Sequence, residues 1–178
     1  MKKLLFASLG ATALLAGCGD KDGNNLPANY IAGNGYESME GWAPSATSIT
    51  TEKAHSGRFS VKVDKDNEFG AGYINLLGKV SPTRVQKLTI KGWAFRTGAD
   101  AKAAVVVSIV NPANPSQKVF WESLDLTTEV KTFNRWTEVS KTFTFPASVA
   151  PTYQLYVYLW RNGGSQPVYL DDVELLRE

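Results

Sequence analysis

The sequence predicts an all-β fold, a β-sandwich or jelly roll of two antiparallel sheets, after a cleaved N-terminal leader. From residue 26 onward, short alternating or β-branched runs are separated by clusters of Gly, Pro, Asn and Ser, a pattern typical of sandwiches and jelly rolls. No run places apolar residues at i, i+3, i+4 and i+7 for long enough to predict a helix. The chain contains no internal repeat, which disfavours a propeller or a solenoid.

The first 17 residues have the layout of a secretory signal peptide. Residues 1–3 are cationic, and residues 4–16 form an apolar segment that is shorter than the roughly 20 residues of a membrane-spanning helix. Residues 15–18, Leu-Ala-Gly-Cys, resemble the bacterial lipobox, in which a peptidase cuts before an acylated cysteine. We therefore expect residues 1–17 to be removed and Cys18 to carry a lipid. The alternative is an ordinary secreted protein with one free thiol.

The mature chain is expected to carry no net charge. Two of the 19 basic residues lie in the leader, which leaves 17 basic and 17 acidic side chains. Such a balance predicts no binding surface for nucleic acid, and contact with a membrane through the lipid anchor alone. Because Cys18 is the only cysteine, there is no disulfide framework. The length suits one domain and not two.

Residues 18–26 are expected to form a flexible tether, and residues 27–178 the β domain. The tether is polar and rich in Gly and Asn, without periodicity. Its acidic stretch behind Cys18 resembles the surface-export signal of Bacteroidetes lipoproteins. We therefore expect a lipid-anchored protein of the outer membrane, and both the surface and the periplasmic side stay open.

Nine strands are expected in the domain, each a short alternating or β-branched run between turn residues. They cover residues 48–52, 59–63, 72–76, 87–96, 103–110, 118–124, 137–145, 154–161 and 168–176. Trp136, which precedes the seventh run, is expected in the core of the sandwich. Trp121, near a Pro-rich loop, is left without an assignment.

The order of several landmarks along the domain suggests a family. These landmarks are Asn-Gly-Tyr-Glu at 34–37, Gly-Trp at 41–42, His-Ser-Gly-Arg-Phe-Ser-Val at 55–61, Leu-Thr-Ile-Lys-Gly-Trp at 88–93, Trp-Thr-Glu-Val at 136–139 and Tyr-Leu-Asp-Asp-Val-Glu-Leu at 169–175. The series resembles the galactose-binding-like β-jelly rolls that include carbohydrate-binding modules of the family 4, 9 and 22 type. The resemblance implies the fold more firmly than the function, because such domains also serve as passive modules.

The resemblance also implies a structural calcium that ties the start of the domain to its final strand. The matching ligands are the Glu37 carboxylate, backbone carbonyls from Ser56 to Arg58, and an aspartate of the closing pair. Strict alternation would place Asp171 on the same inward face as Val173 and Leu175, and a buried carboxylate needs a partner or a metal. This favours Asp171 over its neighbour as the ligand. The alternative is a pair of solvated aspartates and a surface glutamate.

A glycan would be bound by aromatic side chains, because sugar rings present C–H patches to Trp and Tyr faces and hydroxyls to polar groups. In residues 154–161, the apolar Leu155, Val157 and Leu159 alternate with a second set on the opposite face. That set comprises Gln154, Tyr156, Tyr158 and Trp160, with Arg161 at its end. Such an aromatic stripe opposite a core face is unexpected unless something covers it.

A second strand, residues 87–96, shows a similar pattern with Lys91 and Trp93 opposite its apolar face. We expect Trp93 and the aromatic residues of 154–160 to line one concave face, with Lys91, Gln154 and Arg161 donating and accepting hydrogen bonds. The alternative is that loops cover this face and the aromatic residues stabilise the sheet by packing.

Three functions remain open. The first is a non-catalytic lipoprotein that binds polysaccharide or oligosaccharide, and the second is a structural or adhesion lipoprotein with protein partners in the envelope. The third is a small polysaccharide-active enzyme with paired carboxylates. Catalysis is disfavoured because the chain has a single histidine, His55, and lacks a GxSxG elbow. We therefore expect a carbohydrate-binding protein that is not an enzyme.

Overall fold

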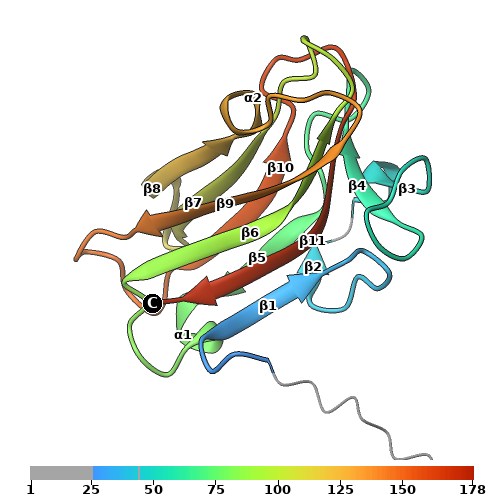
Figure 1. Ribbon diagram of the computed structural model, residues 1–178. Helices are drawn as coiled ribbons and strands as arrows, with labels where there is room; N and C mark the ends of the chain where they lie inside the picture. The colour runs from blue at the N-terminus through green and yellow to red at the C-terminus, as the bar shows by residue number, and fades with distance from the viewer. Residues whose placement is uncertain (1–25, 44) are drawn as a thin grey trace, which may run out of the picture.

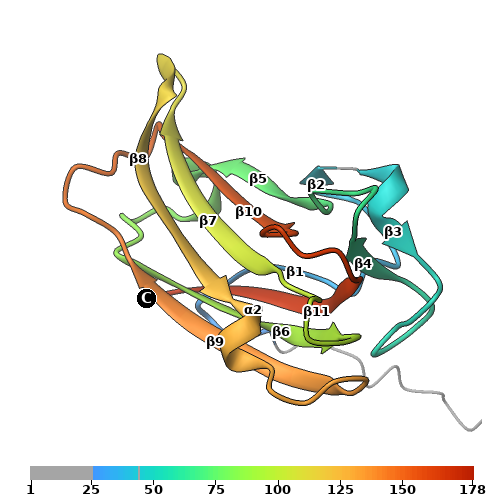
Figure 2. The ribbon, with the colours of Figure 1, turned by 90° about the horizontal axis from the view of Figure 1, so that it is seen from above.

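The computed structural model describes residues 26–43 and 45–178, and it confirms an all-β sandwich of two antiparallel sheets (Figures 1 and 2). The signal peptide, Cys18 and nearly all of the tether lie outside the described residues. No helix in the described part of the chain has the length and apolar character needed to cross a membrane.

Sheet A forms the front layer in Figure 1. Its strands run in the order β3 (Ile49–Thr50), β4 (Ser60–Val63), β11 (Val168–Arg177), β6 (Lys87–Arg96) and β9 (Trp136–Thr144), and β1 (Tyr30–Asn34) also pairs with β11. The first half of β11 pairs with β4 and its second half with β1, so the closing strand holds both ends of the domain together.

Sheet B lies behind sheet A. Its order is β2 (Trp42–Ala43), β5 (Gly72–Leu76), β10 (Gln154–Trp160), β7 (Ala104–Asn111) and β8 (Asn114–Asp125). Figure 2 shows the β7–β8 hairpin extending beyond the other strands. Three short helical turns, η1 (Ala46–Ser48), α1 (Leu77–Val80) and α2 (Leu126–Glu129), connect strands. The last of these is capped by Asp125, which accepts a hydrogen bond from the Thr127 amide at 2.7 Å.

The core lies between the two sheets and is built from alternate residues of each strand, as a period of two requires. Sheet B contributes Leu155, Val157 and Leu159 from β10, and sheet A contributes Leu88 and Ile90 from β6. All five are almost fully buried. Because the two sheets turn these residues toward each other, the intervening residues of each strand lie on an outer face.

All nine expected strands are present, with ends that differ by a few residues. Two strands, β1 and the two-residue β2, were not predicted. Tyr30–Asn34 contains a glycine and an asparagine, which are depleted in strands, and its pairing with β11 is set by contacts at long sequence separation. The residue types of β1 therefore give little indication of a strand.

The prediction that Asp171 shares a face with Val173 and Leu175 is wrong, because β11 contains a bulge. The register with β6 shifts between Asp171 and Glu174, and Asp172 has a φ of 47°. The extra residue places Asp171 on the outer face beside Trp93, while Val173 and Leu175 point into the core.

The prediction of Trp136 as a core residue is also wrong. On β9 the buried residues are Val139 and Phe143, so Trp136 belongs to the alternate, outward set. It pairs with Phe95 of β6 on the outer face of sheet A, where their ring centroids lie 5.5 Å apart.

Candidate functional site

The outer face of sheet B carries the aromatic stripe that the sequence predicts. Tyr156, Tyr158 and Trp160 alternate with buried core residues along β10, and each is partly exposed. Phe69 and Trp121 lie on the same face, with 52% and 41% of their surfaces exposed. These five residues form what we call the aromatic groove.

Small residues on β7 leave room for this groove. Across the ladder, Trp160 pairs with Ala104, Tyr158 with Val106, and Tyr156 with Ser108, which in turn pairs with Trp121 of β8. Because β7 offers no large side chain here, aromatic rings from the strands on either side approach each other over it. The ring centroids of Trp121 and Trp160 lie 6.3 Å apart in an edge-to-face arrangement.

Phe69 divides the groove into two hollows of about 240 Å³ each, and it lines both together with Tyr158. Its backbone forms a β-bridge with Trp160, and the neighbouring Gly70 amide donates to the Leu159 carbonyl at 2.9 Å. The loop before β5 is thereby fixed against β10, and the Phe69 ring packs edge-on against Tyr158 at 5.8 Å.

One hollow carries charged groups. Glu68 accepts a hydrogen bond from the Trp160 indole N–H at 3.4 Å, and the Lys118 ammonium lies 5.8 Å from the Trp121 ring centroid. Burial raises the pKa of the Tyr158 phenol, and a hydrogen bond from Trp121 opposes that shift. The Glu68 carboxylate and the Lys118 ammonium can both hydrogen-bond to sugar hydroxyls, and their opposite charges leave this hollow without a net charge.

Gln154 and Arg161, the polar residues predicted at the ends of the stripe, have different surroundings. The Gln154 amide oxygen accepts a hydrogen bond from the Tyr156 hydroxyl at 2.7 Å, so it orients a groove residue. Arg161 follows the strand, its amide donates to the Glu68 carbonyl at 2.9 Å, and its buried Nε has no hydrogen-bond partner. Arg161 lines neither hollow.

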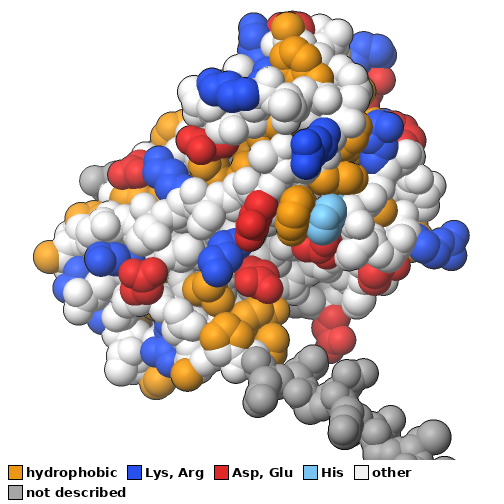
Figure 3. All heavy atoms as spheres, in the orientation of Figure 1, with side chains coloured by type: hydrophobic (Ala, Val, Ile, Leu, Met, Phe, Trp, Pro, Cys, Tyr) orange, Lys and Arg blue, Asp and Glu red, His pale blue; other side chains and the backbone are white. Residues whose placement is uncertain are grey.

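Lys91 and Trp93 do not join the groove, because β6 belongs to sheet A and their side chains lie on the opposite outer face. Figure 3 shows that face, with the single histidine among hydrophobic and acidic side chains. The His55 ring stacks on Trp93 at 4.0 Å between centroids and 11° between planes. The structure therefore splits the predicted site between two faces.

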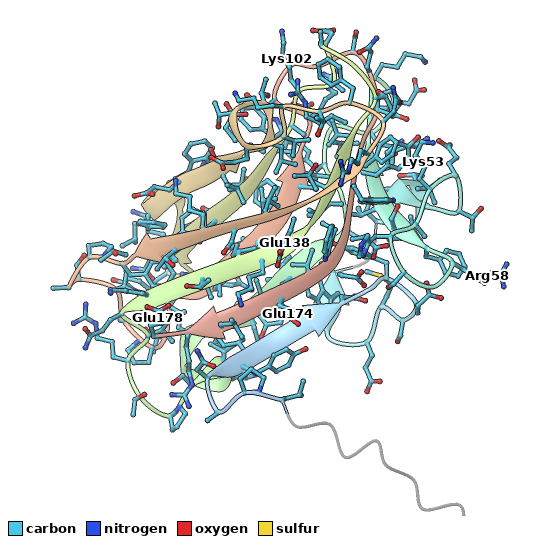
Figure 4. All side chains as sticks on the ribbon, viewed as in Figure 1. Lys53, Arg58, Lys102, Glu138, Glu174 and Glu178 are labelled. Carbon is cyan, nitrogen blue, oxygen red and sulfur yellow. The ribbon has the colours of Figure 1, made fainter. Side chains whose placement is uncertain are left out.

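The residues assigned to calcium surround one turn, residues 55–59. Asp171 is fully buried there, and its Oδ2 accepts hydrogen bonds from the His55 amide at 2.7 Å and the Ser56 amide at 3.3 Å. On the other side of the turn, Glu37 Oε1 accepts from the Arg58 amide at 2.6 Å and the amide of the next residue at 2.8 Å. The Arg58 side chain points away from the domain (Figure 4).

These contacts do not fit a calcium site well. The carboxylates of Glu37 and Asp171 face N–H donors, whereas calcium requires six to eight converging oxygens. Among residues 26–43 and 45–178, no group of three or more His, Cys, Asp and Glu side chains could hold a metal. Burial raises the pKa of Asp171, and the N–H groups of His55, Asp172 and Ser56 oppose that shift. Calcium here stays a prediction from the resemblance.

The sequence of this β-sandwich matches a known family over most of its length. Residues 28–165 match the profile of the family described as Carbohydrate binding domain, of the 4/9 type. The chain belongs to this family. The resemblance predicted from its landmarks is confirmed, and carbohydrate binding is the family's shared property.

Solved carbohydrate-binding modules share the fold of this domain. The CBM22-1 xylan-binding domain of Paenibacillus barcinonensis Xyn10C is 15% identical, with a TM-score of 0.54 over 83% of this chain and 94% of that one. The C-terminal family 22 module of Clostridium thermocellum Xyn10B is 14% identical, with a TM-score of 0.54 over 84% and 93%. A family 16 module is 19% identical, with a TM-score of 0.54 over 83% and 99%. A search of curated protein sequences finds no match.

Four residues that line the hollow with charged groups have no role in the sequence prediction: Glu68, Phe69, Lys118 and Trp121. The outward direction of Trp121 could have been predicted from alternation along β8. Trp121 lies three residues before the buried Leu124, so the two side chains point to opposite faces. Glu68 and Phe69 lie in an irregular loop, where alternation predicts no direction. Their position depends on the bridge between Phe69 and Trp160.

Proposed function

We propose that this chain is a non-catalytic lipoprotein that captures neutral polysaccharide through the aromatic groove of sheet B. The observation that carries the proposal is the exposure of Phe69 and Trp121, together with partly exposed Tyr158 and Trp160, on one hollowed face. Exposed aromatic residues in a concave site are costly to leave in water and match the C–H faces of sugars. Several solved relatives of this fold are xylan-binding domains, which makes xylan the first polymer to test.

The absence of catalysis is supported by the chemistry of the groove. Hydrolysis of a glycosidic bond ordinarily requires two carboxyl groups that flank it. Among the described residues that line the two hollows, Glu68 alone carries a carboxylate.

The His55 cluster offers no Ser-His-Asp triad. Ser56 Oγ and His55 Nδ1 both bond to Asp172, each at 2.6 Å. A nucleophilic serine would instead bond to the histidine that deprotonates it. We therefore assign this cluster to the packing of the turn, which agrees with a protein that binds a glycan without cleaving it.

The lipid anchor at Cys18 completes the proposal. Outer-membrane attachment through the lipid would hold the groove at the cell envelope. Cys18→Ser should give a protein that remains uncleaved or unlipidated and no longer partitions with membranes. Recovery of the variant in the lipoprotein fraction would contradict the lipid anchor, but it would leave the proposed binding role of the groove unchanged.

Binding to soluble polysaccharides tests the groove. The full-length chain in detergent should bind at least one of xylan, mixed-linkage β-glucan and mannan in isothermal titration calorimetry. Trp160→Ala should weaken that binding by about 30-fold, because loss of a central aromatic residue typically costs 2 kcal/mol or more. Trp93→Ala is the matched control, since it removes a partly exposed tryptophan from the opposite sheet, and it should leave the affinity unchanged.

Two results would overturn this proposal. Binding that is lost in Trp93→Ala and kept in Trp160→Ala would place the site on sheet A. No binding to any glycan by the wild type would favour the alternative of an envelope lipoprotein with protein partners.

A further inference from the structure

The two hollows of the aromatic groove differ in chemistry. The hollow beside Trp121 and Trp160 contains the charged side chains of Glu68 and Lys118. The hollow on the other side of Phe69 lies over β5, where Ile74 is 38% exposed and Ala43 forms part of the rim. The described residues that line this second hollow include no charged side chain. We call it the apolar hollow.

The floor of the apolar hollow is backbone. Gly70 and Gly72 line it, and a Cβ on Gly72 would lie 2.8 Å from the Tyr158 Cβ and clash with the Val157 carbonyl oxygen. A side chain at Gly72 is therefore excluded by its neighbours. Glycine inside a strand commonly marks a place where a ligand approaches the backbone closely.

Two tyrosines of the strands beneath this hollow have hydrogen-bond partners within the domain. Tyr156 donates to Gln154 at 2.7 Å, and the Tyr73 hydroxyl accepts from Asn75 at 3.3 Å. Backbone groups of Gly72 and Tyr73 lie in the ladders to β2 and β10. A sugar hydroxyl placed against this floor would lose its water partners and gain few others, which is unfavourable.

We propose that the apolar hollow selects glycans that carry a methyl group, as an O-acetyl, O-methyl or 6-deoxy substituent. The methyl group would lie over Gly70 and Gly72 between Phe69 and Ile74, while the hydroxyls of the same sugar stay in water at the open rim. The neighbouring unit of the chain would then meet Glu68 and Lys118. This inference rests on the proposed function and assigns a ligand class to one part of its site.

Acetylated xylan and the same xylan after alkaline deacetylation are the first pair of probes. The full-length chain in detergent should bind the acetylated form about fourfold more tightly, which is the value of burying one methyl group. The second pair of probes is a polymer of the 6-deoxy sugar rhamnose and mannan. It tests the methyl group at C6 of rhamnose independently of an acetyl methyl group. Preference within either pair supports the inference and names the source of the methyl group.

Ile74→Thr locates the preference in the apolar hollow. It keeps a β-branched side chain in β5 and should bring the acetylated-to-deacetylated affinity ratio close to one. Phe133→Ala is the control, because Phe133 is similarly exposed, at 43%, and lies in the loop before β9. It should leave the ratio at about four, the wild-type value.

Equal affinities within both probe pairs would overturn the methyl selectivity while leaving polysaccharide binding intact. A ratio that persists in Ile74→Thr would also overturn it, because the substituent would then be read elsewhere. Failure of the wild type to bind any of these polymers would instead refute the proposed function, so the two failures are distinguishable.

Discussion

The outer faces of the two sheets carry similar aromatic patterns but end in different states. On sheet B, Phe69 and Trp121 remain 52% and 41% exposed beside two hollows. On sheet A, Phe95 and Tyr169 are buried, and Trp93 is stacked under His55. Glu138 and Glu174, which lie on the same outer face beyond the turn, are exposed (Figure 4).

The difference arises from the loop beside each sheet and from the strand residues that hold it. On sheet A, the 55–59 turn folds over the face because Asp171 and Asp172 hold it there. On sheet B, the loop before β5 contributes Phe69 to the groove and leaves the hollows open. An outward aromatic stripe therefore stays open to solvent only where strand side chains do not hold a neighbouring loop over it.

The largest expected effect comes from releasing the turn on sheet A. Asp171→Ala leaves three partly buried N–H groups without their acceptor, at about 1–3 kcal/mol each when unsatisfied. We expect a loss of about 3–5 kcal/mol in the free energy of unfolding, measured by urea denaturation, with a red shift of tryptophan emission as Trp93 is uncovered. Asp172→Ala is the matched control and should cost about 1 kcal/mol, because its contacts are more exposed. Equal losses in both variants would refute this account of the turn.

Trp136→Ala and Trp121→Ala compare the two faces directly. Trp136 packs against Phe95 and His55, so its loss should lower stability by about 2 kcal/mol, roughly half of the cost for a fully buried tryptophan. Trp121→Ala should lower stability by less than about 1 kcal/mol, as expected for an exposed side chain. Thermal unfolding of both variants checks this. A larger loss for Trp121 would mean that the groove is packed and not open.

A smaller effect is expected at the sheet A edge, where the Lys62 ammonium contacts Glu52 at 2.8 Å and Asp64 at 3.0 Å. The hydrogen bond from Lys62 lowers the pKa of Glu52, and the pKa of Asp64 is lowered by Lys62 and Asn67 against the opposing effect of burial. Both pKa values lie below the unfolded value of about 4, so this stabilisation is complete above about pH 5 and is lost as the pH falls through the folded pKa values.

Lys62→Met measures this contribution. The stability difference between wild type and variant should be about 1 kcal/mol at pH 7, because the Glu52 carboxylate is 54% exposed and its ion pair is weak. The difference should shrink toward zero near pH 2, because both carboxylates are then protonated. Urea denaturation at the two pH values gives both differences. A difference that grows on acidification would reverse the assigned direction of the pKa shifts.

The smallest expected effect is that of a chelator. The amide contacts of Glu37 and Asp171 alone predict an unchanged melting temperature in excess EDTA, because these carboxylates already have N–H partners. A melting temperature that falls with EDTA and recovers with calcium chloride would establish the calcium that the family resemblance implies, since a ligand of the native state stabilises it. Magnesium chloride serves as the control for ionic strength.

Much of the fold could be predicted from the sequence, because alternation and turn residues are local signals. They located nine strands and separated Leu155, Val157 and Leu159 from the aromatic side of β10. Alternation states whether a side chain points inward or outward, but not which sheet its strand joins. Trp93 and Trp160 were therefore placed on one face, although pairings at long sequence separation put them on opposite sides of the sandwich.

The bulge at Asp172 has a consequence for how the closing strand holds the 55–59 turn. In a regular strand, neighbouring side chains point to opposite faces, so a single loop could reach only one of two adjacent aspartates. With Asp172 at a positive φ, both aspartates contact His55 and Ser56. Deletion of Asp172 would leave Asp171, Val173 and Glu174 opposite Trp93, Gly92 and Lys91, so the strand would alternate regularly and keep its pairing with β6. Its cost would be the loss of the two contacts from Asp172 to His55 and Ser56. The extra residue is thus not needed to orient Val173 and Leu175, and its effect is to present two adjacent carboxylates to the same turn.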